Sequence, residues 1–221
     1  MPLDLNALET RILGCLLEKE RMTPENYPLS LNALTNACNQ STNRDPVTFY
    51  DEKVVEEGVN LLREKKLAAV LFGAGSRVQK YRHRLPEHYE LQPGETGLLC
   101  VLLLRGPQTL GELRTRVERF FMFASLDAVK QCLDGLAKPG TDLVKLLPQQ
   151  PGQKEQRYIQ LLSEPSVHAE MPARESAAPV DYTSSTSVRD RVDVLEKQVG
   201  ELQAELQKMR EEFQAFRKQF E

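Results

Sequence analysis

The chain has 221 residues, 40% of them hydrophobic, and its 29 lysines and arginines nearly balance 32 aspartates and glutamates. A length of this order fits one or two domains of ~100–200 residues. The balanced charge by itself does not require a nucleic-acid or membrane partner, and no apolar run approaches the ~20 residues that span a bilayer. The first residues lack signal-peptide character. We therefore expect a soluble, cytoplasmic protein with no membrane partner.

The first 88 residues carry the signals of three helices and a β-hairpin. Apolar residues recur at steps of three and four, which is typical of amphipathic helices, and Asp4 or Asn6 can cap the first one. Two short apolar runs then flank the turn Gly73-Ala-Gly-Ser76, which indicates a hairpin. The expected helices cover 5–22, 30–39 and 51–66, and the expected strands cover 67–72 and 77–85.

The same order returns in residues 89–163. Residues 6–23 reappear in degraded form at 92–109, with Glu9-Thr10 aligned on Glu95-Thr96 at an offset of 86. A repeat of domain size indicates two copies of one module rather than a solenoid, whose periods run ~20–50 residues. Three helices followed by a hairpin is the winged-helix order. The sequence thus predicts a mainly α protein with small β-hairpins (α+β), built from two tandem winged-helix domains at 1–88 and 89–163.

The remaining residues divide into a linker and a periodic helix. Residues 164–187 are rich in proline, alanine and serine, a composition typical of disorder. From 188 to 221 a heptad pattern places valine at a and leucine at d in its first half, which favours a parallel coiled-coil dimer. The alternative is one amphipathic helix that folds back onto the body. The expected dimerisation residues are Val192, Leu195, Val199, Leu202, Leu206, Met209, Phe213, Phe216 and Phe220.

Catalytic or metal-binding chemistry has little support in this sequence. His83, His88 and His168 are the only histidines, and none has metal-ligand spacing with a cysteine or carboxylate. The glycine-rich turn lacks the Lys-Ser/Thr of a phosphate loop and sits between strands. We expect a non-enzymatic protein without a metal or cofactor.

The strongest candidate for function is the basic hairpin of the first module. Alternate residues of a strand share one face, so Lys80, Arg82 and Arg84 are expected to point the same way, with Arg77 nearby. Such a wing can lie along a phosphate backbone and give affinity without reading sequence. The alternative is a charged edge that only keeps the hairpin soluble. Together with the polar loop after the second helix, the expected DNA-contacting residues are Asn39, Gln40, Asn43, Arg44, Arg77, Lys80, Arg82 and Arg84.

The third helix argues against ordinary base reading. Its start is acidic at the positions that a recognition helix would present to the bases, and phosphates would repel it. The connection before it, 40–50, is also longer than the turn of ~3–4 residues in DNA readers. These features, with the loop Phe120-Phe-Met-Phe123, favour the alternative of a protein-interaction scaffold with an unidentified protein partner. Our first hypothesis remains a dimeric, double-stranded-DNA-associated regulator.

Several motifs resemble the YceH family of bacterial proteins. The resemblance covers both modules and implies two winged-helix modules, often with a C-terminal helical tail. It implies no activity, cofactor or catalytic residue. The motifs that carry it are Leu16-Leu-Glu-Lys19, Thr23-Pro-Glu-Asn-Tyr-Pro-Leu-Ser30, Ala37-Cys-Asn-Gln40 with Asn43-Arg-Asp-Pro-Val47, Gly75-Ser-Arg-Val78 with Lys80-Tyr81, and Leu102-Leu-Leu-Arg-Gly-Pro-Gln-Thr109 with Gly111-Glu-Leu-Arg114.

Overall fold

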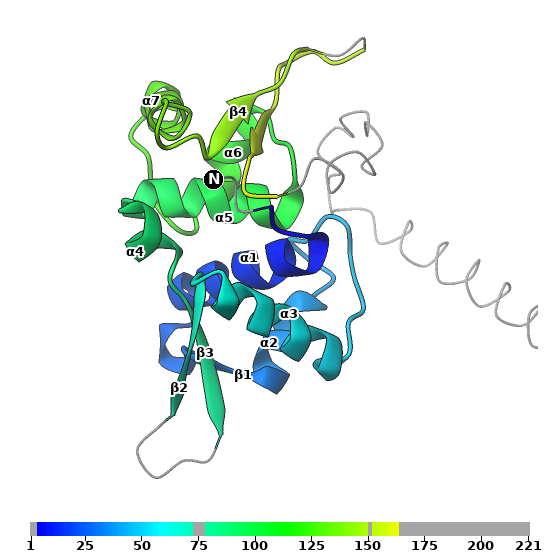
Figure 1. Ribbon diagram of the computed structural model, residues 1–221. Coiled ribbons are helices and arrows are strands. Elements are labelled where there is room, and N and C mark those ends of the chain that lie inside the picture. Colours follow the sequence, from blue (N-terminus) through cyan, green and yellow to red (C-terminus); the bar gives the residue numbers. More distant parts are fainter. Residues whose placement is uncertain (1–3, 73–77, 150–151, 164–221) are drawn as a thin grey trace, which may run out of the picture. The chain divides into compact units, whose positions relative to one another are not determined.

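A computed structural model of the chain describes residues 4–72, 78–149 and 152–163 (Figure 1). Within them lie seven α-helices, one short 3-10 helix and two small antiparallel sheets. This confirms the expected mixture of helices and small β-hairpins. Arg77, the predicted linker 164–187 and the predicted coiled coil 188–221, with all its dimerisation residues, lie outside the described residues.

The first repeat follows the predicted order and adds three short elements. A 3-10 helix, η1 (Pro24–Asn26), and a two-residue strand separate the first two helices, because Pro24 ends the helical pattern of α1. A third addition, α4, follows the hairpin and leads to the second repeat. The elements are α1 (Ala7–Met22), β1 (Leu29–Ser30), α2 (Leu31–Cys38), α3 (Glu52–Glu64), β2 (Ala68–Phe72), β3 (Gln79–His83) and α4 (Leu85–Tyr89).

The second repeat has the same order with shorter strands. The sequence predicts helices at about 94–105, 110–119 and 125–138, and the three observed helices match these spans to within two residues at each end. The hairpin strands are shorter than the predicted 143–147 and 157–162. Thr109 and Ser125 cap the second and third helices by accepting hydrogen bonds from backbone N–H groups. The elements are α5 (Pro93–Arg105), α6 (Leu110–Val117), α7 (Leu126–Leu136), β4 (Val144–Leu146) and β5 (Tyr158–Gln160).

Both repeats pair the residues just before their second helix with the last strand of their hairpin. In the first, Leu29 of β1 lies opposite Tyr81, giving the sheet order β1-β3-β2. In the second, Gln108 and Tyr158 exchange backbone hydrogen bonds of 3.0 and 2.7 Å. Sequence periodicity did not predict this pairing, because two residues are too few to show the alternation of a strand. The pairing ties each hairpin to its own helices.

The sequence repeat is a repeat in local structure as well. Asn6 N–H donates to the carboxylate of Glu9 at 2.9 Å, and Gln92 N–H donates to that of Glu95 at 2.8 Å. One turn on, the threonine hydroxyls at 10 and 96 each donate to the carbonyl four residues earlier. Each pair of residues therefore fixes the start of an equivalent helix, α1 or α5.

The equivalent helices α1 and α5 lie side by side at the centre of the described residues (Figure 1). One continuous core joins the two repeats, and both belong to the same compact unit. At the helix crossing the Cys100 thiol donates to the Gly14 carbonyl at 3.5 Å. These two residues are related by the repeat offset of 86, so the repeats meet through the same position of each copy.

Gly14 is the position where this packing has no room for a side chain. A β-carbon there would lie 2.8 Å from Cγ and Cδ2 of Leu104 and 3.2 Å from Cβ of Leu103. Both leucines are buried in the shared core, so neither has open space to move into.

We expect Gly14→Ala to lower the free energy of unfolding by about 1–3 kcal/mol, because the extra methyl overpacks the core between the repeats. Gly111→Ala is the matched control, because a β-carbon at Gly111 meets nothing within 4 Å. It should be neutral or stabilising by about 0.4–1 kcal/mol. Urea denaturation of both variants measures the difference. Equal denaturation midpoints for the two variants would contradict the close packing of Gly14 against α5.

Candidate nucleic-acid interface

The strand β3 of the hairpin β2–β3 (Figure 1) carries two of the predicted basic residues, Lys80 and Arg82. Along β3, Tyr81 and His83 are buried, while Lys80 is exposed and Arg82 is partly exposed. Antiparallel pairing with β1 on one side and β2 on the other fixes this alternation. Arg84 follows the strand and is also exposed. Lys80 and Arg82 therefore share one face of β3, whereas Arg84, predicted on the same strand, lies just beyond it as the residue before α4. We call these three residues the wing cations.

The wing cations differ in their ion-pair partners and in their exposure to solvent. Arg82 donates to the Glu87 carboxylate of α4 at 2.9 Å, at a site where both side chains are substantially exposed. An ion pair of this kind contributes little and is easily exchanged for another anion. Lys80 and Arg84 are the more exposed members of the set. Arg63 and Lys66, at the end of α3, are exposed too, whereas Lys65 binds the buried carboxylate of Glu9 at 2.7 Å.

The surface of α3 has the opposite charge at its start. Glu52, Glu56 and Glu57 are exposed there, while Val55 and Val59 turn inward to the core. Carboxylates on this face would meet DNA phosphates with like charge. The structure thus places an acidic helix face and a basic hairpin in the same repeat.

Arg44, one of the residues predicted to contact DNA, lies inside the protein rather than on its surface. Its side chain is 0% exposed and makes a bidentate pair with the carboxylate of Glu18, with N–O distances of 2.5 and 3.2 Å. It also donates to the carbonyl of Ala37 at 2.9 and 3.1 Å. Polar sequence character alone could not separate a DNA-contacting arginine from one that closes a loop.

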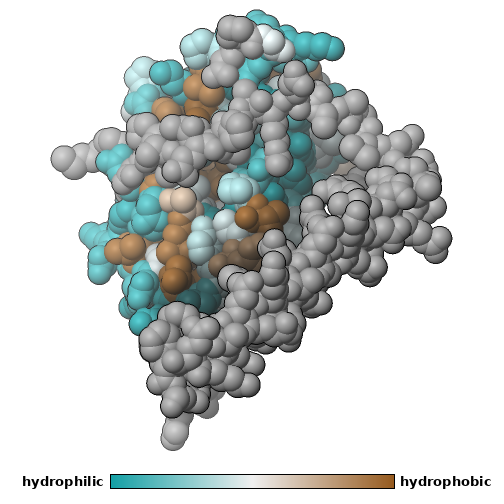
Figure 2. All heavy atoms as spheres, turned by 90° about the vertical axis from the view of Figure 1, so that its right-hand side faces the viewer, coloured by the Kyte–Doolittle hydropathy of each residue, from teal (hydrophilic) through white to brown (hydrophobic). Residues whose placement is uncertain are grey.

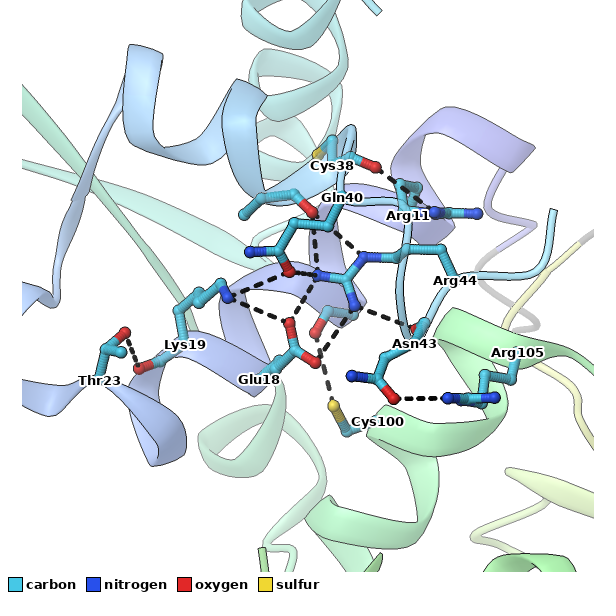
Figure 3. A network of polar contacts seen from close by, with 12 residues as sticks. Arg11, Glu18, Lys19, Thr23, Cys38, Gln40, Asn43, Arg44, Cys100 and Arg105 are labelled. Carbon is cyan, nitrogen blue, oxygen red and sulfur yellow. Dashed lines mark hydrogen bonds and ion pairs between the residues drawn. The ribbon is translucent and has the colours of Figure 1, made fainter. Parts of the chain in front are cut away.

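The other three polar residues predicted in this region, Asn39, Gln40 and Asn43, are likewise engaged inside the protein, and Figure 3 shows the contacts of Gln40 and Asn43. Asn39 exchanges two hydrogen bonds with the backbone of Tyr50, of 2.7 and 2.8 Å. Gln40 accepts from Lys19 at 3.2 Å and from Arg44, and Asn43 accepts from Arg105 at 2.5 Å. The loop 40–50 is therefore held against α1 and α5, and these contacts explain its polar composition without a ligand.

Glu18 is the centre of this polar network, and sequence analysis did not identify it. Besides Arg44, its carboxylate accepts from Arg119 at the end of α6, 2.7 Å away. Burial alone would raise the pKa of Glu18, but the hydrogen bond from Arg44 and the charges of Arg44, Arg119 and Lys19 outweigh it and lower the pKa. Its partners lie 26 and 101 residues away in the chain, so no local pattern could reveal them.

Two further observations concern the described residues as a whole. No three histidine, cysteine, aspartate or glutamate side chains among residues 4–72, 78–149 and 152–163 gather as metal ligands would. Over the same ranges, none of the helices combines the length and the apolar character needed to cross a bilayer.

The architecture defines a class of two-repeat mixed α/β proteins whose equivalent helices meet in one core. Residues 5–153 match the family described as "Protein of unknown function, DUF480". Whole-length relatives, each named "UPF0502 protein", include one from Pelobacter propionicus, 49% identical over 221 residues with both chains covered completely. Another, from Solibacter usitatus, is 46% identical over 97% of this chain and 100% of the relative. The chain belongs to this DUF480/UPF0502 family.

We expect Glu18→Gln to lower the free energy of unfolding by about 3 kcal/mol, because it leaves the guanidinium of Arg44 buried without its counter-charge. Glu87→Gln, which removes the carboxylate of the exposed pair with Arg82, should cost less than about 1 kcal/mol. Chemical denaturation of the two variants measures the difference. Similar losses of unfolding free energy in both variants would show that the buried ion pair contributes no more to stability than the exposed one.

The same ion pair should make stability depend on acid pH. Because folding lowers the pKa of Glu18 below 4.5, its contribution is present above that value and is lost as the pH falls through the folded pKa. Unfolding midpoints measured on a series of decreasing pH should therefore fall less steeply in Glu18→Gln than in the unmodified chain. An unchanged slope would show that Glu18 gains no charge stabilisation on folding.

Proposed function

We propose that the two repeats are tandem winged-helix domains. Each has three helices, a strand pairing placed just before the second helix, and a hairpin after the third. The pairings Leu29–Tyr81 and Gln108–Tyr158 support this, because they give both hairpins the same attachment to the helices. In this arrangement β2 and β3 form the wing of the first domain.

We further propose that the protein associates with double-stranded DNA through this wing. The observation that carries the proposal is that Lys80 and Arg82 share the face of β3 opposite its buried residues, while Arg84 follows directly after the strand, with Lys80 and Arg84 exposed. Arginine and lysine side chains so placed bind phosphate oxygens, which gives affinity and orientation without base recognition. The exposed Arg63 and Lys66 at the end of α3 extend the positive surface toward the helices.

The proposed contact differs from that of a sequence-reading helix. The acids Glu52, Glu56 and Glu57 keep the start of α3 away from phosphates, so the third helix does not enter the major groove. The loop 40–50 takes no part either, since its side chains bind α1 and α5. Wing contact alone predicts DNA affinity that is largely independent of sequence and strongly dependent on salt.

A parallel coiled coil at 188–221 would double this surface. Two wings joined in one dimer bind a duplex with higher avidity, because the second contact becomes intramolecular. We place this activity in the cytoplasm, in a regulatory role.

Sedimentation equilibrium of the chain and of a Leu195→Asp/Leu202→Asp variant tests the dimer. The unmodified chain should be dimeric and the variant monomeric. A monomeric mass for both proteins would contradict the coiled-coil dimer.

The test of DNA association is fluorescence anisotropy with a duplex of random sequence at low and physiological salt. We expect binding that weakens as salt rises and is lost in Lys80→Glu/Arg84→Glu, because that variant reverses the two exposed wing charges. The control is Lys130→Glu/Lys138→Glu, which makes the same change of charge on exposed residues of the second repeat. Equal loss in both variants would show only a response to net charge.

A protein-interaction scaffold is the second candidate, favoured by exposed apolar side chains. Phe72 at the end of β2 is 68% exposed, Phe49 in the loop is 87% exposed and Met122 is 81% exposed. Phe120 and Phe123, by contrast, pack against the core, so the Phe-rich loop is only partly a surface feature. Figure 2 shows one face on which brown apolar groups lie among hydrophilic ones.

Salt distinguishes the two candidates. Phosphate contacts weaken steeply as ionic strength rises, whereas a partner held by apolar contacts remains bound. If the unmodified protein fails to bind duplex DNA even at low salt, the wing proposal is wrong. The exposed residues Phe72 and Phe49 then become the first positions to vary in a search for a protein partner.

A further inference from the structure

A pocket of about 210 Å³ lies where the loop of the first repeat meets two helices of the second. The polar residues that line it are Asn43 from the loop, Arg105 at the end of α5, and Thr115, Arg116 and Arg119 from α6 and the turn after it. Apolar side chains of α5 complete the wall. Three of the five polar residues are arginines, and no carboxylate lines the pocket. The pocket shares no residue with the wing cations.

The carboxylates nearest to two of these arginines are already shared with other cations. Glu112 lies 3.8 Å from Arg116 but only 2.8 Å from Arg157, with which it makes the closer pair. Glu18 binds Arg119 at 2.7 Å while it also accepts the bidentate pair from Arg44. Each of these two carboxylates is thus shared by two arginines, so the positive charge on the pocket side of α6 is only partly balanced.

The third arginine is held in place by a neutral group. Arg105 donates to the side-chain oxygen of Asn43 at 2.5 Å, an amide that orients the guanidinium without neutralising it. Burial first, and then the positive charges of Arg116 and Arg119, lower the pKa of Arg105, against an opposing effect of Asp45. All three guanidinium-bearing residues line this one small pocket, so their like charges repel one another. A guanidinium has five N–H donors, so each of the three retains donors beyond its present bonds.

We propose that this pocket binds a small anion carrying a phosphate group. Arginine forks match phosphate oxygens with paired hydrogen bonds, and an anion between them would relieve their mutual repulsion. The volume lies below the ~300–1,000 Å³ of pockets that enclose drug-sized ligands. It therefore fits inorganic phosphate, pyrophosphate, or the phosphate end of a larger metabolite whose remainder stays in solvent.

Binding there would connect the two repeats. Asn43 belongs to the first repeat and the arginines to the second, and Arg119 also contacts Glu18 of the first. An anion that contacts all three arginines would strengthen this junction, and a ligand that binds only the folded state raises its stability. The pocket would then act as a ligand-binding site that sets the rigidity of the repeat junction, whatever the wing binds.

The test is isothermal titration calorimetry of the full chain with inorganic phosphate and with pyrophosphate, at constant ionic strength adjusted with chloride. We expect saturable binding, tighter for pyrophosphate, accompanied by a rise in melting temperature. Arg116→Gln should weaken it roughly tenfold, because one charge-assisted pair of hydrogen bonds is lost. Arg114→Gln is the control, since it removes the same charge from the exposed face of the same helix outside the pocket.

Three results would overturn the proposal. One is the absence of saturable binding, and another is an equal loss of affinity in Arg116→Gln and Arg114→Gln, which would reflect net charge alone. The third is displacement of pyrophosphate by a short DNA duplex, which would assign the pocket to a backbone phosphate. Simultaneous binding of pyrophosphate and duplex would support a separate small-anion site. Failure of the wing variants to affect DNA leaves the pyrophosphate result standing, so the two proposals fail separately.

Discussion

The junction between the two repeats is organised around one buried carboxylate. Glu18 lies on α1 and accepts hydrogen bonds from Arg44 in its own repeat and from Arg119 in the other. A buried carboxylate is costly unless it is paired, so its position requires both the loop 40–50 and the end of α6 to stay where they are. The loop in turn contacts the end of α5, where Asp45 N–H donates to the carbonyl of Leu104 at 2.9 Å. Apolar packing of α1 on α5 brings the repeats together, and this polar network fixes how the loop between α2 and α3 closes over them.

That constraint separates the cations of the protein into two groups. Arg44, which faces the repeat junction, holds the fold together and has no exposed side-chain surface. The wing cations stand on a hairpin that is anchored by Tyr81 and by its pairing with β1, and they have no comparable internal partners among the described residues apart from Glu87. A charged residue becomes available to a partner when no buried group of opposite charge needs it. This distinction supports the wing rather than the loop as the surface for an anionic partner.

Much of the architecture could be predicted because it depends on local patterns. The helical periodicity gave α1, α3 and α7 to within a few residues, and the alignment of Glu9-Thr10 on Glu95-Thr96 marked equivalent helix starts. The strand β1 and the helix α4 were not predicted, because elements of two and five residues are too short for periodicity to register. The candidate site was predicted only in part. Alternation along β3 correctly grouped Lys80 with Arg82, whereas the polar loop was assigned to DNA on composition alone.

The sequence by itself determined the repeat, the order of helices and hairpins in each copy, and the outward face of β3. These follow from short-range spacing, which the chain carries in full. Only the tertiary structure decided that α1 and α5 pack through Gly14 and Cys100, that Glu18 draws arginines from both repeats, and that a pocket of arginines forms between them. Each of these depends on which residues distant in the chain become neighbours when the apolar core is buried. The packing of the core determines these neighbours, and no local sequence pattern predicts them.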